Sequence, residues 1–242
     1  MIDERVRLYE QSPLLEVAGD TIRPGGLELT DRALGLCALP SGARVLEVGC
    51  GPAASSAHLV DHYGFNTIGL DPSEVLLRSG RSRHPQLPLV RSYGEWLPIA
   101  DNQLDAVLTE CSLSVMRQAQ RALSEFRRVL RAGGFLILSD IYARNPAGIE
   151  ALRDLPIDSC LCGAVSQAQI IDRVERAGFR VALWEDHTQA IKVFTAKLIW
   201  SNGSLQQFWC RATSHADAAT IQTAIAHSKP GYYLLIAQKT GQ

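Results

Sequence analysis

Short apolar runs alternate with amphipathic segments along most of the chain. Six runs have the length and the β-branched or leucine-rich composition of strands: 44–48, 66–70, 87–90, 104–108, 135–138 and 179–184. Four segments between them have helical spacing of apolar residues: 53–63, 73–82, 117–131 and 167–177. Alternation at this spacing predicts βαβ units, and therefore a doubly wound α/β fold with a mostly parallel sheet.

The two ends of the chain differ from this alternating core. Residues 1–40 include a helix expected from about Leu27 to Ala38, and they are predicted to form a helical cap on a core at 43–186. Residues 187–230 predict a helical insertion, and 231–239 the last strand. The insertion has three predicted helices, at 189–200, from Ser204 onward and at 216–227. Because no repeat or linker interrupts the chain, residues 1–242 are interpreted as a single domain.

Local signals predict where individual helices begin and end. Ser73 is a candidate N-cap, and Ser204 followed by Gln207 has the spacing of a capping box. Gly133 and Gly134 follow an amphipathic helix, and glycine readily adopts the left-handed conformation of a helix C-terminus. The helix that starts near residue 117 is therefore expected to end at these glycines.

Composition narrows the functional classes. Hydrophobic residues make up 46% and charged residues 20%, and the formal net charge is −1, so no bulk field attracts nucleic acid. No apolar run approaches the roughly 20 residues that span a bilayer, and no apolar stretch follows the charges at the N-terminus. We expect a cytoplasmic protein without a membrane span or a nucleic-acid partner. The six cysteines are expected to be free thiols. Because Cys160 and Cys162 lack the spacing of a zinc knuckle, no metal site is expected.

A glycine turn follows the first strand of the core. The sequence is Glu47-Val48-Gly49-Cys50-Gly51-Pro52-Ala53, and the next strand ends at Asp71. Such a turn lets a ligand approach the backbone and points a helix N-terminus at it. An acid about 20 residues further on can accept hydrogen bonds from a ribose diol. These features fit a nicotinamide enzyme as well as a methyltransferase.

Three details favour a methyltransferase. Ala54 replaces the third glycine of the dinucleotide fingerprint, with Pro52 inside the loop, which suits a pyrophosphate poorly. Glu47 precedes the first glycine by two residues, where a carboxylate can face an ammonium group. Residues 94–105 then read Gly-Glu-Trp-Leu-Pro-Ile-Ala-Asp-Asn-Gln-Leu-Asp.

That segment resembles the D-A-E-x-L-P-F-x-D-x-x-F-D motif of class I S-adenosylmethionine-dependent methyltransferases. Within this class the chain resembles the type 11 methyltransferase superfamily, and in particular quinone-biosynthesis and arsenite methyltransferases. Residues 128–136 are similar to the family's R-V-L-K-P-G-G-x-L. With the glycine turn, the resemblance covers roughly residues 43–140 in the family's order. It implies a Rossmann-like sheet of seven strands whose last strand is antiparallel, with a helical insertion before that strand.

The resemblance also implies a set of cofactor contacts. Gly49, Cys50 and Gly51 would line the methionine part of S-adenosylmethionine, with Glu47 beneath them. Asp71 would hold the ribose hydroxyls. The remaining implied positions are Pro72 beside the adenine, Gly94 and Glu95 near the ring, and Glu110 and Cys111 under the sulfonium. Tyr93 replaces the acid that the family places at the adenine amino group.

Two of these assignments have plain structural alternatives. Asp71 could serve only as a helix cap, and Glu95 could bond only local backbone. Arg23 lies before the core and could pair with the cofactor carboxylate if the N-terminal segment folds over the site. A solvated loop arginine is the alternative.

The methyl acceptor is predicted only as a class. His187 follows the sixth strand and is the best-placed histidine for a base, with a surface position as its alternative. The segments around Cys111 and around Cys160 and Cys162 resemble parts of arsenite methyltransferases, whose thiolates bind the metalloid. Buried cysteines also pack as small hydrophobes. The acceptor is expected to be a small molecule: a thiol, a metalloid, a quinone or an amine.

Two rival functions stay open from the sequence. A nicotinamide-dependent oxidoreductase would use the same glycine turn, and a non-catalytic module would bind S-adenosylmethionine without turnover. In the leading interpretation the product is S-adenosylhomocysteine. The sequence predicts no oligomeric state.

Overall fold

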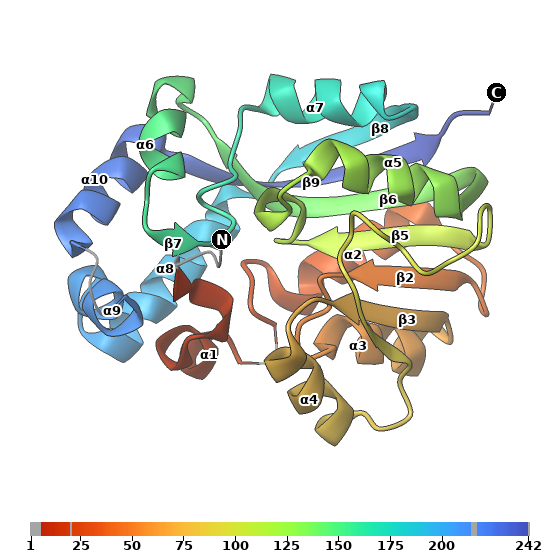
Figure 1. Cartoon of the computed structure of the whole chain (residues 1–242), viewed down its shortest axis with the longest axis horizontal. Coiled ribbons are helices and arrows are strands. Elements are labelled where there is room, and N and C mark those ends of the chain that lie inside the picture. Colours follow the sequence, from red (N-terminus) through yellow and green to blue (C-terminus); the bar gives the residue numbers. More distant parts are fainter. Residues whose placement is uncertain (1–5, 20, 214–216, 242) are drawn as a thin grey trace.

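The protein folds around a seven-stranded sheet with helices on both faces, in a computed structural model that describes residues 6–19, 21–213 and 217–241 (Figure 1). The strand order is β4-β3-β2-β5-β6-β9-β8. The bounds are β2 (Arg44–Val48), β3 (Asn66–Asp71), β4 (Leu89–Arg91), β5 (Leu104–Glu110), β6 (Leu130–Ala143), β8 (Phe179–Asp186) and β9 (Pro230–Lys239). β9 pairs antiparallel with both β6 and β8, while the pairs from β4 through β6 are parallel. The predicted fold class and the antiparallel last strand are confirmed.

Successive side chains of each strand enter two separate cores, as the pleat of a strand requires. On β9, Tyr232, Leu234 and Ile236 join one core. Their neighbours Tyr233 and Leu235 join the other. Helices α2 (Gly26–Cys37) and α3 (Ala54–Tyr63) cover the first face, and α5 (Ala119–Val129) and α7 (Gln167–Arg176) cover the second. Because strands covered on both faces are apolar throughout, the sequence showed continuous runs instead of alternation.

Most predicted helix boundaries agree with the structure, and one is wrong. The Ser73 hydroxyl accepts a hydrogen bond from the Leu76 amide at 3.3 Å and caps α4 (Glu74–Arg83), as expected. Helix α5, however, ends at Val129, before the two glycines. Leu130 is already extended and pairs with Leu104, so the chain joins the sheet early. Gly133, with φ of 73°, serves a bend inside β6 instead of a helix C-terminus.

Elements too short for sequence patterns connect the N-terminal segment to the middle of the chain. β1 (Val6–Arg7) pairs in parallel with β7 (Ile157–Asp158). Helix α1 (Ser12–Ala18) follows β1, and α6 (Ile149–Arg153) precedes β7. Two-residue strands carry no periodicity, so neither was predicted. Their pairing fixes the loop that follows β7.

The three predicted helices of the insertion are present as α8 (Thr188–Asn202), α9 (Leu205–Ala212) and α10 (Ala218–Ser228). The Ser204 hydroxyl accepts from the Gln207 amide at 3.1 Å, which confirms Ser204 as the N-cap of α9. Ala216, the first residue of the third predicted helix, lies outside the described residues. Within the described part of the chain, no helix has both the length and the apolar character that crossing a membrane requires.

Leu108 on the central strand β5 tests the packing of the first core. Its side chain is fully buried, so Leu108→Ala should lower the free energy of unfolding by about 2–5 kcal/mol through lost transfer energy and a residual cavity. Leu36→Ala is the matched control, because Leu36 is 42% exposed on α2. Urea denaturation measures both. Equal losses for the two variants would contradict the assigned core.

Candidate functional site

The glycine turn after β2 is built so that only glycine fits its first position. The amides of Gly49 and Cys50 both donate to the Leu70 carbonyl of β3, at 2.7 and 3.1 Å. Gly49 has φ of 78° and Gly51 has φ of 53°, in the left-handed region. A Cβ on Gly49 would collide with the side chain of Ser112, which follows β5. The turn therefore presses against the end of the neighbouring strand.

Asp71 joins the end of β3 to this turn. Its Oδ2 accepts from the Gly51 amide at 2.9 Å, and its Oδ1 accepts from the Ser73 amide at 2.8 Å. The side chain is buried, and burial raises its pKa. Each carboxylate oxygen has a second lone pair, so these two bonds leave acceptor capacity for a ribose diol. Asp71 can therefore cap the start of α4 and still accept hydrogen bonds from a ribose.

Glu47 lies beneath the turn as a buried carboxyl group. The Ser56 hydroxyl, on α3, donates to its Oε2. Burial, followed by the negative charge of Glu110, raises the pKa of Glu47 to about 8. A carboxyl group held protonated near neutral pH is prepared to ionise beside an incoming cation, because the cation removes the electrostatic cost.

Arg23 and Glu110 form a buried ion pair next to Glu47. Arg23 Nη2 donates to Glu110 Oε2 at 2.6 Å, and each side chain is only 5% exposed. Thr30 of α2 and Ser55 of α3 add hydroxyl hydrogen bonds to the same carboxylate, at 2.9 and 3.0 Å. The Nη1 atom of Arg23 is buried and has no hydrogen-bond partner among the described residues. The N-terminal segment thus folds over the carboxyl end of β5, and Arg23 is not a solvated loop arginine.

These groups surround one cavity of about 50 Å³. Its lining comes from the N-terminal segment, the glycine turn, α3 and the end of β5: Thr21, Ile22, Arg23, Glu47, Gly49, Cys50, Gly51, Pro52, Ala54, Ser55 and Glu110. The unpartnered guanidinium nitrogen can bind a carboxylate, and the Glu47 carboxylate can bind an ammonium group. Together they fit the two charged ends of an amino acid.

The residues expected near the adenine lie outside this lining. Tyr93 is 55% exposed and meets Trp96 edge to face, with ring centroids 6.4 Å apart. A Cβ on Gly94 would strike the side chain of Met116. The buried Glu95 carboxylate accepts from the Gln118 amide at 3.1 Å, immediately before α5. This contact supports the alternative that Glu95 bonds only local backbone.

Pro72 also lies outside the cavity. It is half-buried between Asp71 and the N-cap of α4, and its carbonyl accepts from Arg91 Nε at 3.2 Å. Its role beside an adenine stays a prediction.

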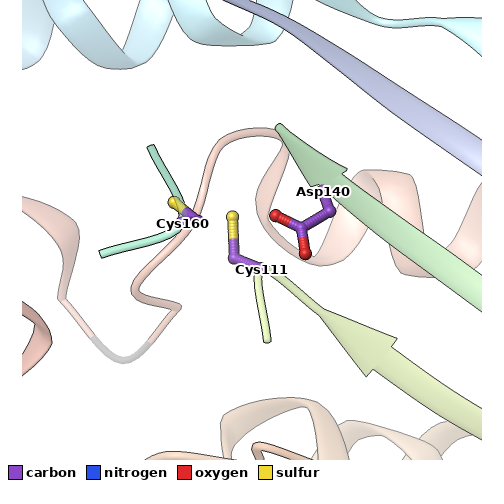
Figure 2. Close-up of side chains that lie close together, drawn as sticks. All are labelled: Cys111, Asp140 and Cys160. Carbon is purple, nitrogen blue, oxygen red and sulfur yellow. The ribbon is translucent and has the colours of Figure 1, made fainter. Parts of the chain in front are cut away.

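A second cluster lies beyond the end of β5. The ligand atoms of Cys111, Asp140 and Cys160 all lie within 4.8 Å of one another, and Figure 2 shows the Cys111 sulfur pointing into the space between the other two. The neighbouring Cys111 thiol and burial raise the pKa of Cys160. Burial raises the pKa of Asp140 to about 6. Cys162 points elsewhere, since its Sγ donates to the Ile157 carbonyl at 3.1 Å.

Asp140 was missed by sequence reasoning, although a signal for it exists. Glu110 pairs with Ser139 across β5 and β6, so the following residues Cys111 and Asp140 must be neighbours. Finding the pair requires the strand register, which the sequence does not supply.

His187 lies after β8 at the far edge of the sheet. Its Nε2 is 2.9 Å from Glu185 Oε2, and the same carboxylate pairs with Arg32 at 2.7 Å. Its backbone amide donates to the Tyr232 carbonyl at 2.7 Å. His187 thus contacts Glu185, which itself pairs with Arg32, and its role as a base stays a prediction.

A larger cavity of about 520 Å³ lies at the opposite end of the sheet, around Asn102, Arg128 and Lys239. Its cations already have partners: Arg128 pairs with Asp101 at 2.7 Å, and Lys239 donates to the Leu130 carbonyl at 2.6 Å. Open α/β sheets bind ligands at the carboxyl ends of their strands, so the smaller cavity is the stronger candidate.

Comparison with known proteins gives a family match over the centre of the chain. Residues 46–138 match the family described as Methyltransferase domain. This region contains the glycine turn, Asp71 and the end of β5, and it leaves Arg23 and Cys160 outside.

Two relatives and one solved structure also resemble this chain. The chain is similar to the demethylmenaquinone methyltransferases of Renibacterium salmoninarum and Beutenbergia cavernae, with 30% and 33% identity over 57% and 63% of this chain. The matched regions span 59% and 61% of those proteins, so the chain covers about six-tenths of their length. The crystal structure of the [4+2]-cyclase SpnF superposes with a TM-score of 0.71 and 24% identity, covering 89% of this chain and 82% of that one.

Glu47 gives the site a specific dependence on pH. Its pKa of about 8 lies above the ordinary value of 4.5, so the folded protein holds a proton that the unfolded chain loses within this range. The contribution of Glu47 to stability should therefore fall as pH rises from about 5 to 8, on the order of 3 kcal/mol. Glu47→Gln should show a flatter dependence than the parent protein in urea denaturation at pH 5.5 and pH 8. Identical dependences would show that Glu47 is not buried as a neutral acid.

Proposed function

We propose that the chain is a class I S-adenosylmethionine-dependent methyltransferase, which transfers a methyl group from S-adenosylmethionine to a small-molecule acceptor. The match of residues 46–138 to the methyltransferase family and the similarity to two demethylmenaquinone methyltransferases support this proposal. The fold supports this function without determining it, since the superposed SpnF is named as a cyclase. The residues around the cavity supply the further support.

The observation that carries the proposal is the buried, unpartnered Nη1 of Arg23 beside the glycine turn. A buried guanidinium nitrogen without an acceptor is costly, and a carboxylate would satisfy it. The Glu47 carboxyl lines the same cavity and offers a partner for an ammonium group. We assign Arg23 to the carboxylate and Glu47 to the ammonium of the methionine moiety.

The ribose is assigned to Asp71. Its carboxylate is held by the amides of Gly51 and Ser73 and is therefore fixed in position before any ligand binds. We assign the adenine to the region beyond Asp71 that contains Pro72, Tyr93, Gly94 and Glu95. Cys50 would pack against the methionine chain, as its buried position in the turn permits.

When bound, S-adenosylmethionine supplies an electrophilic methyl group on a sulfonium. The chain's contribution is alignment of the acceptor and exclusion of water, which together account for much of the rate of an in-line displacement. The acceptor side is assigned to the region beyond Glu110, where Cys111 and Cys160 lie. There the Cys111 thiol donates to the Tyr232 hydroxyl at 3.4 Å. His187 is kept as a candidate base.

Quinols are the first acceptor class to test. Two relatives are named as demethylmenaquinone methyltransferases, and thiols, metalloids and amines are the other classes. The rival oxidoreductase finds no support, because the family match is to methyltransferases.

Titration calorimetry with S-adenosylhomocysteine tests cofactor binding. Asp71→Asn keeps the size of the side chain but removes its charge, so affinity should fall by about 10–100-fold, as for the loss of charged hydrogen bonds. Asp172→Asn, on the exposed surface of α7, should leave affinity unchanged. Tighter binding of NAD than of S-adenosylhomocysteine, or unchanged affinity in Asp71→Asn, would contradict the proposal.

Transfer of a labelled methyl group tests catalysis. Incubation with labelled donor and a panel of quinols, thiols, trivalent metalloids and amines should give a labelled product in at least one class. Cofactor binding without any transfer to the panel would instead favour a non-catalytic binding module.

A further inference from the structure

Two thiols and a carboxylate meet at the carboxyl edge of the sheet, outside the cavity assigned to the cofactor. Cys111 follows β5, Asp140 lies in β6, and Cys160 comes from the loop between β7 and α7 (Figure 2). Their Sγ and carboxylate oxygen atoms all lie within 4.8 Å of one another. The methyl-transfer proposal does not require such a set.

We propose that Cys111, Cys160 and Asp140 bind a thiophilic divalent cation such as Zn²⁺. Two thiolates and one carboxylate are the ligands that such an ion prefers, and three protein ligands leave a fourth position open. Binding replaces two S–H bonds with two metal–sulfur bonds and releases two protons to solvent. The sequence predicted no metal site because Cys160 and Cys162 lack the spacing of a zinc knuckle, and the predicted site residues did not include Asp140.

The carboxylate is positioned before any ion binds. Asp140 is 2% exposed, and it accepts from the Ser114 amide and hydroxyl at 3.0 and 2.8 Å and from the Ile141 amide at 2.7 Å. All three donors are neutral. A fixed, buried carboxylate facing two thiols matches the supporting hydrogen bonds found around metal ligands.

The thiols are positioned by special backbone geometry. Cys111 has φ of 53°, which a residue with a side chain rarely adopts. The loop carrying Cys160 contacts the segment after Cys111 so closely that a Cβ on Gly163 would collide with the Ser114 carbonyl. Gly163 therefore permits the approach of Cys160 to Cys111.

Cys160 and Cys162 have different roles in this arrangement. The Cys162 thiol donates to the Ile157 carbonyl, in the strand β7 that pairs with β1. It secures the loop, whereas Cys160 belongs to the three-residue cluster. Only Cys160 is expected to contribute a ligand.

The open coordination position would lie close to the methyl donor. Ser112, next to Cys111, donates to the Gly49 carbonyl at 3.4 Å, which connects the cluster to the glycine turn. A thiol or hydroxyl group that ligates the ion would be more acidic there than in water. Ion binding itself is independent of the proposed function, because it is measured without cofactor or acceptor.

Titration of the reduced, chelator-treated protein with Co²⁺ tests the site. We expect one equivalent to bind with thiolate-to-cobalt charge-transfer absorption in the near ultraviolet, and Zn²⁺ to displace it. Cys160→Ser should lower the Co²⁺ affinity at least about tenfold, since one of three protein ligands is lost. Asp140→Asn should lower the affinity while the thiolate absorption remains, which provides a second test if Cys160→Ser does not fold.

Cys162→Ser is the matched control, because it lies two residues away and a serine can keep the bond to Ile157. Cys210→Ser is a remote control on the exposed face of α9. Both should bind Co²⁺ as the parent protein does. Absence of thiolate absorption in the parent protein, unchanged affinity in Cys160→Ser, or equal losses in Cys160→Ser and Cys162→Ser would overturn the proposal.

Discussion

The buried ion pair between Arg23 and Glu110 is the interaction on which the candidate site depends. The two residues are 87 positions apart, and their contact of 2.6 Å joins the N-terminal segment to the end of a central strand. Removing two charges from water is expensive, and this pair offsets the cost with hydroxyl donors from α2 and α3. Both residues of the pair line the cavity, and the buried Nη1 of Arg23 has no hydrogen-bond partner among the described residues.

The distribution of charge around the cavity follows from this pair. Glu110 is paired with Arg23. The Glu47 carboxyl accepts a hydrogen bond from Ser56 but forms no comparable ion pair within the part of the chain that the structure describes, and burial keeps its pKa elevated at about 8. A zwitterionic ligand would complete both groups at once, with its carboxylate at Arg23 and its ammonium at Glu47. In the proposed assignment, these two groups would favour an amino-acid moiety over an uncharged one.

The sequence predicted the sheet because its strands are apolar on both faces and its turns carry glycine and aspartate. It also predicted Glu47 and Gly49 from a continuous glycine motif and Asp71 from the end of the next strand. The structure joins Asp71 to that turn through the Gly51 amide, while the cofactor roles of these residues stay predictions. The partner of Arg23 and the role of Asp140 could not be predicted, because both depend on contacts between segments distant in the chain. The end of α5 was misplaced for a related reason: pairing of Leu130 with β5 outweighed the local signal of the glycines.

A crystal structure of the complex with S-adenosylhomocysteine tests the central claim most directly. The account predicts the ligand carboxylate within hydrogen-bond distance of Arg23 Nη1, the amino group beside Glu47 and the ribose hydroxyls on Asp71. A ligand bound at the opposite end of the sheet, or one whose carboxylate is turned away from Arg23 toward solvent, would contradict it.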